Sequence, residues 1–293
     1  MRKSRCPRTG SVLVEFAIIA LVLYLLLAAI IEFGRMGYGA QTVQQAADTG
    51  ARELARIPLP PQTTFAEALA DPQVRSRVYD PRYLVVSRAD VDAAPTNGSL
   101  TTYMADKPVL NRLLSGLFIF DLERDVWRYP GALAMQTNGD MTVLVPLIVS
   151  RSAEGHEVIE WHDVVEELRP DPAQEGPFSL LAPTPPNPPG LTGMVALQIH
   201  YPFQAATMSS YQPGADPELG RPNVPNRADD GAVTAINSPP GGATLVGEAA
   251  ADGTPATYSG AFGLGEQQAL TIRVRPYRRV ITVQAVYRRE VFD

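Results

Sequence analysis

The N-terminal sequence contains a long apolar run that is followed by a segment with helical periodicity. Residues 12–31 are apolar apart from Glu15 and Tyr24. A helix of that length would measure about 30 Å, the thickness of the hydrocarbon core of a bilayer. No small-x-small cleavage site follows the run, which favours a retained span over a secretory signal peptide. The pattern therefore predicts a transmembrane helix over residues 11–33.

Beyond this run, the apolar positions recur at intervals of three and four residues while Gln, Asp and Arg fill the other positions, which is typical of an amphipathic helix. We expect residues 34–57 to continue the membrane helix in this form, and Pro58 to end it. The glycines between residues 34 and 39 indicate a bend or a close helix contact. The recurring apolar positions are Met36, Ala40, Val43, Ala47, Ala51 and Leu54.

The rest of the chain predicts an exported head domain of the α+β class. β-Branched runs parted by Gly and Pro favour a mainly antiparallel sheet with long Pro/Gly-rich loops. Thr64 and Glu67 form a capping-box pattern at the start of a short helix. A buried helix followed by an edge strand is expected within 110–127. Strands are expected at 82–92, 141–152, 156–168 with some helical character at its end, 194–204 with a break at Pro202, and twice within 269–292 around Pro276.

Composition divides the head into regions. Residues 58–168 form an exported α+β region, and residues 169–193 contain eight prolines, which is typical of an extended linker or surface loop. Residues 194–293 form a β-rich region. Within it, residues 213–268 are rich in Gly and Pro and have little periodicity, so they predict a long insertion between strands or a mobile flap.

Charge gives the orientation in the membrane. Residues 1–10 form a basic leader with four basic and no acidic residues, whereas the whole chain has a net charge of −6. By the positive-inside rule, the leader stays in the cytoplasm and the residues after the span cross to the other side. The acidic body argues against nucleic-acid binding.

Glu15 is the unusual residue of the apolar run, because an acid in hydrocarbon is costly and is commonly functional. If the chain is cut after Gly10, a new α-amino group forms at Ser11, one helical turn from Glu15. The two opposite charges can pair within one chain or between neighbouring chains. Pairing between chains would fix how far one helix is shifted along its axis relative to the next, because only one shift brings both charges together. The alternative is a helix-end acid that reaches the interface and favours the positive helix N-terminus.

The same residues carry a resemblance to a known family. The spacing of Gly10, four residues and then Glu15-Phe16, behind a basic leader, resembles the type III leader of type IV pilins, most closely the Flp branch. Over residues 8–57 the chain resembles the TadE/TadG-like proteins of tight-adherence systems. The matching motifs are Val14-Glu15-Phe16, Glu32-Phe33-Gly34-Arg35 and Gly50-Ala51-Arg52-Glu53.

This resemblance implies a minor pilin or pseudopilin of a tight-adherence (Flp-type) pilus assembly system. A prepilin peptidase would cut between Gly10 and Ser11, and Glu15 and Phe16 would serve pairing and assembly within the membrane. The implied partners are other pilin or pseudopilin subunits, the peptidase and the inner-membrane assembly platform. The implied location is the bacterial inner membrane, single-pass, with the N-terminus cytoplasmic and the C-terminal domain periplasmic, or an extracellular pilus. The alternative is an uncleaved single-pass anchor that presents a periplasmic binding domain to envelope partners.

Catalytic chemistry finds little support in the sequence, and no catalytic residue, cofactor or metal is expected. His156 and His162 lie among acidic residues, but their spacing matches no zinc motif. A solvated acidic edge is the favoured interpretation. The acidic residues concerned are Glu157, Glu160, Asp163 and Glu166.

Overall fold

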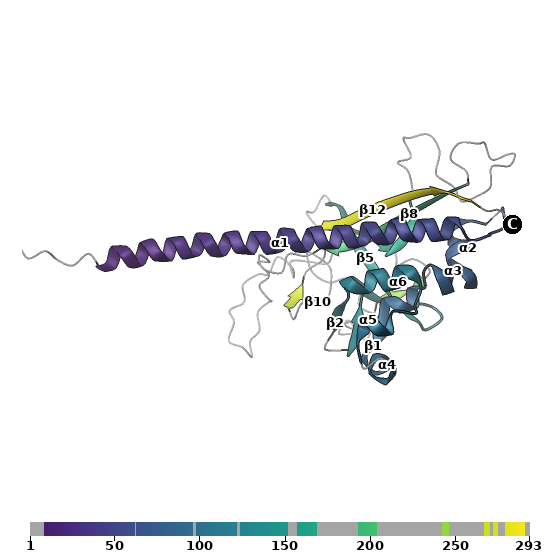
Figure 1. The fold of residues 1–293 in the computed structure, drawn as a ribbon, viewed down its shortest axis with the longest axis horizontal. Helices are drawn as coiled ribbons and strands as arrows, with labels where there is room; N and C mark the ends of the chain where they lie inside the picture. The colour runs from purple at the N-terminus through teal and green to yellow at the C-terminus, as the bar shows by residue number, and fades with distance from the viewer. Residues whose placement is uncertain are drawn as a thin grey trace, which may run out of the picture.

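A helix of 47 residues, α1 (Thr9–Ala55), forms a stalk, and the head packs along two sides of its C-terminal half (Figure 1). At 1.5 Å per residue it is about 70 Å long. The helix passes through the three glycines between residues 34 and 39 without interruption. It ends two residues earlier than expected, in tighter turns in which the amides of Arg56 and Ile57 donate to the carbonyls of Glu53 and Leu54.

The computed structural model describes residues 9–61, 63–95, 98–121, 124–151, 157–168, 193–203, 242–245, 267–269, 272–274 and 279–290. Their arrangement, a long helix followed by short helices and antiparallel sheets, confirms the predicted α+β class. The leader residues 1–8 and the proline-rich residues 169–192 lie outside the described residues, as does most of 213–268.

Short helices follow the stalk. The predicted capping box is confirmed: the Glu67 amide donates to Thr64 Oγ1 at 3.3 Å, and the Thr64 amide donates to Glu67 Oε2 at 2.8 Å. Asp71 caps the next helix by accepting from the Gln73 amide at 2.6 Å. The helices are α2 (Phe65–Ala70), α3 (Pro72–Arg77), η1 (Pro81–Leu84), α4 (Arg88–Ala93), α5 (Leu100–Tyr103), α6 (Val109–Leu114) and η2 (Ser115–Leu117).

The strands form small antiparallel sheets. The strands are β1 (Val85–Ser87), β2 (Ile119–Asp121), β3 (Val126–Arg128), β4 (Ala132–Met135), β5 (Met141–Arg151), β6 (Glu157–Asp163), β7 (Val165–Glu167), β8 (Met194–Phe203), β9 (Thr244–Leu245), β10 (Gln267–Ala269), β11 (Ile272–Val274) and β12 (Arg279–Arg288). One sheet has the order β1-β3-β2, another β6-β5-β4-β9, a third β12-β8-β7, and β10 pairs with β11. Only Val164 separates β6 from β7, so the chain passes directly from the four-stranded sheet into the β12-β8-β7 sheet.

Three local predictions were wrong. The strand expected over 82–92 is limited to β1, because η1 precedes it and Ser87 caps α4 by accepting from the Ala89 amide. The end of 156–168 is the strand β7 rather than a helix. Pro202 does not break β8 and pairs with Val280 of β12. Strand β7 pairs with β8 only between Leu197 and Ile199. At Pro202 the edge of β8 that faces β7 is therefore not paired with β7, and a proline, which has no amide hydrogen to donate, is tolerated there.

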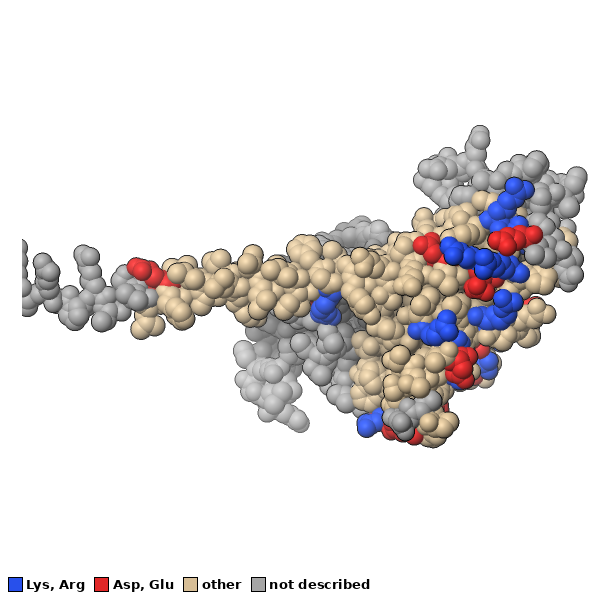
Figure 2. All heavy atoms as spheres, in the orientation of Figure 1, with Lys and Arg blue, Asp and Glu red and all other residues tan. Residues whose placement is uncertain are grey.

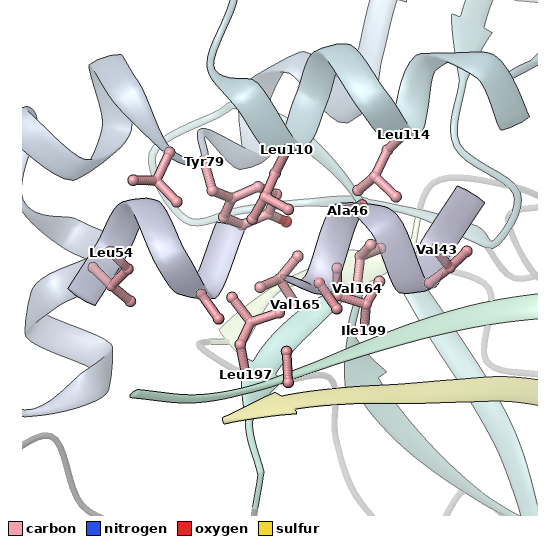
Figure 3. Close-up of a cluster of buried hydrophobic side chains, with 14 of the residues drawn as sticks. Val43, Ala46, Leu54, Tyr79, Leu110, Leu114, Val164, Val165, Leu197 and Ile199 are labelled. Carbon is pink, nitrogen blue, oxygen red and sulfur yellow. The ribbon is translucent and has the colours of Figure 1, made fainter. Parts of the chain in front are cut away.

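The main core lies where the stalk enters the head. Figure 3 shows this part of α1 between α6, which contributes Leu110 and Leu114, and the sheet, which contributes Leu197 and Ile199. All four leucine and isoleucine side chains are fully buried. The inner half of the stalk is therefore a core element of the head, enclosed from two sides.

Small residues on α1 allow this close packing. A Cβ placed on Gly50 would lie 2.6 Å from Leu110 Cδ2, and one placed on Gly39 would lie 2.8 Å from Tyr201 Cε1. A Cβ on Gly34 or Gly37 would meet nothing within 4 Å. Among these three glycines Gly39 alone has a close neighbour, and that neighbour, Tyr201, belongs to the strand β8 rather than to another helix.

The C-terminal strand β12 runs beside α1 and fastens the end of the stalk (Figure 1). The Glu290 amide donates to the Ala55 carbonyl at 3.0 Å, and the Arg289 guanidinium donates to the Leu59 carbonyl. Gln44 of the helix donates from Nε2 to the Gln284 carbonyl at 3.3 Å. Contacts between residues more than 200 positions apart in sequence therefore hold the head against the stalk.

Candidate functional site

The outer half of α1 exposes apolar side chains on every side. Every described residue from Leu13 to Leu27 is exposed, with Phe16 at 70%. Figure 2 shows this part of the stalk as almost free of charged side chains, whereas Lys, Arg, Asp and Glu gather on the head. A helix that is apolar all round needs an apolar environment. By length and composition, α1 is compatible with a single-pass membrane anchor.

The predicted processing residues lie at the start of this helix. Gly10 and Ser11 are in the first turn of α1, and Glu15 follows four residues after Ser11. Residues four apart lie on one face of a helix, and side chains there lean toward the N-terminus. The backbone therefore directs the Glu15 side chain toward the turn that contains Ser11.

Glu15 and Phe16 are both exposed, as are all the described residues of α1 from Leu13 to Leu27. This end of α1 is therefore accessible to other apolar helices. The predicted assembly pair is thus placed on the apolar surface of the stalk, next to the predicted cleavage position.

The apolar run ends at a charged pair. Arg35 Nη1 donates to Glu32 Oε1 at 3.4 Å, so the two residues form the expected i,i+3 pair. The Glu32 side chain is 11% exposed. Burial along α1 begins at Ala28, and past the pair Gly39 and Val43 are buried as well, so the Glu32–Arg35 pair lies between the fully exposed part of the stalk and the part packed against the head.

The stalk and head together define a class of protein: a helix suited to anchoring in a membrane, with an α+β domain built around its inner half. Residues 10–52 match the model of the TadE-like protein family, so the N-terminal segment of this chain is TadE-like and the predicted resemblance to TadE-like proteins is confirmed. The match associates the chain with assembly of the Tad pilus. It ends within α1, and the head beyond residue 52 lies outside it. Neither a curated protein nor a solved structure matches the chain.

Proposed function

We propose that this chain is a minor pilin or pseudopilin of a tight-adherence (Flp-type) pilus assembly system. The observation that carries the proposal is the exposed apolar helix with Glu15 one turn beyond Gly10 and Ser11, within a TadE-like segment. The protein acts through contacts rather than catalysis: its stalk packs beside other pilin helices, and its head engages neighbouring subunits or the inner-membrane platform.

In this mechanism a prepilin peptidase cuts after Gly10 on the cytoplasmic side. The cut removes the basic leader and leaves a positive α-amino group on Ser11. In hydrocarbon this amine and the Glu15 carboxylate attract far more strongly than they would in water. When the partners belong to neighbouring subunits, their pairing fixes the axial offset of the two stalks.

A second candidate is an uncleaved anchor that presents the head to envelope partners. The observation in its favour is the size of the head, since residues 53–293 lie outside the TadE-like match. In this role the stalk only tethers, and neither Gly10 nor Glu15 is needed for more than insertion.

Replacing Gly10 by valine separates the two candidates. In cells that lack the native chain, the Gly10→Val protein should enter the membrane, keep its leader and fail to restore pili. The control is Gly37→Val, because a Cβ on Gly37 meets nothing within 4 Å and the site is not next to the predicted cut. Pili are counted by electron microscopy, and the leader is followed by intact mass. Normal pili with the Gly10→Val chain would favour the uncleaved anchor.

A further inference from the structure

Two histidines and a glutamate meet where the chain crosses from one sheet to the next. Glu166 of β7 places Oε1 3.1 Å from His162 Nδ1 of β6 and 2.7 Å from His200 Nε2 of β8. The two imidazole rings are tilted toward each other, with their centroids 4.9 Å apart. One ligand atom from each of the three side chains lies within 4.8 Å of the other two.

We propose that His162, Glu166 and His200 form a binding site for a divalent transition metal of the zinc class. Two imidazoles and a carboxylate are a donor set that Zn²⁺ accepts, with bonds of about 2.0–2.2 Å. Ligand atoms around a tetrahedral ion at that distance are about 3.3–3.5 Å apart. Glu166 Oε1 lies closer than this to the two ring nitrogens, at 3.1 and 2.7 Å, and the three atoms lie within 4.8 Å of one another, so a bound ion requires small side-chain adjustments.

The surroundings of His200 hold its ring in a ligating orientation. His200 is 2% exposed, and its Nδ1 lies 3.1 Å from Thr282 Oγ1 on β12. With the proton on Nδ1 donated to the threonine hydroxyl, the Nε2 lone pair faces Glu166 and the proposed ion. Such a hydrogen bond to the far ring nitrogen is the usual outer-shell support of a metal-bound histidine.

The charge of the site also suits a cation. A glutamate side chain is ordinarily ionised at neutral pH, and Glu166 places its carboxylate between the two imidazoles. Glu160 of β6, whose Oε2 lies 4.0 Å from His162 Nε2, brings a further carboxylate close to the site.

The ion would join three strands of two sheets. His162 belongs to the four-stranded sheet, whereas Glu166 and His200 belong to the sheet that packs on α1. Coordination would thus link the four-stranded sheet to the β12-β8-β7 sheet, which packs on α1. Three protein ligands leave one tetrahedral position, which a water molecule or a donor from another molecule fills.

Zinc titration of the full chain in detergent, after treatment with a chelator, tests the proposal. By calorimetry, the wild-type chain is expected to bind one equivalent of Zn²⁺. Glu166→Gln and His162→Ala should each weaken binding at least about tenfold. Glu167→Gln is the matched control, because it makes the same charge change on the next residue of β7, whose side chain lies on the opposite face. Zinc should also raise the unfolding temperature of the wild-type and Glu167→Gln chains but not of Glu166→Gln.

Circular dichroism without metal checks that each variant keeps its fold. A wild-type chain that takes up no zinc overturns the proposal, as does equal zinc binding by the wild-type, Glu166→Gln and His162→Ala chains. Cobalt(II) gives an independent reading on the wild-type chain alone: bands typical of four-coordinate cobalt support the site. A spectrum equal to that of the aqueous ion refutes it.

Discussion

Replacing Glu15 by leucine is expected to abolish pilus assembly while the chain still inserts into the membrane. An acid in the centre of a membrane helix costs about 2.5–3.5 kcal/mol on insertion scales, so its removal should not impair insertion. Assembly should fail because the amine released at Ser11, in the same or the neighbouring subunit, loses its counter-charge. Pili in the sheared surface fraction and the chain in the membrane fraction are quantified by immunoblot.

Glu32 provides a control position for the loss of an acid from α1. It is the second acid of the apolar helix, but it is paired within the chain with Arg35, and it lies beside the head. The Glu32→Gln chain is therefore expected to support assembly. Wild-type numbers of pili with Glu15→Leu would leave Glu15 as a helix-end acid with no role in packing between subunits.

The largest loss of stability is expected at Leu110, where the head closes on the stalk. This side chain is fully buried and packs against Gly50 of α1. Leu110→Ala should lower the free energy of unfolding of the head by about 2–5 kcal/mol, because it removes buried apolar surface and leaves a cavity. Leu113→Ala, on the half-buried side of the same helix, should cost clearly less. Denaturant unfolding of the detergent-solubilised chains gives both values.

Gly50 allows a second test of the same contact. Gly50→Ala forces a methyl group against Leu110 and should cost about 1–3 kcal/mol, whereas Gly37→Ala, in open space, should be neutral or stabilising by up to about 1 kcal/mol. In the double variant the space left by Leu110→Ala receives the new methyl group. The combined loss should therefore be smaller than the sum of the single losses. A combined loss equal to the sum of the single losses would show that the two residues are not in contact.

The stalk could be predicted from sequence because its signals are local. An apolar run sets the length of the exposed helix, and the spacing of Val43, Ala47, Ala51 and Leu54 marks the face that becomes buried. The capping box at Thr64 is likewise contained within four residues. The order of Gly10, Ser11 and Glu15 places the three residues within the first two turns of α1 as soon as the segment is helical.

The head could be predicted only in class, because its contacts are distant in sequence. The pairing of β8 with β12 joins Phe203 to Arg279 across a long intervening segment, and no short pattern specifies it. The histidine cluster could not be predicted for the same reason. His162 and Glu166 are four residues apart in sequence, but His200 belongs to another strand, β8. The available signal was a histidine within the mainly apolar run 194–203, and this residue, His200, is buried in the structure.

The central claim is that a newly released amine at Ser11 neutralises Glu15 within the membrane. The most direct measurement is the intact mass of the wild-type chain extracted from membranes of pilus-forming cells, with sequencing of its N-terminus. A chain that has lost residues 1–10 and begins at Ser11 is expected. A chain that still begins at Met1 while pili are being built would contradict the claim and identify the stalk as a plain tether.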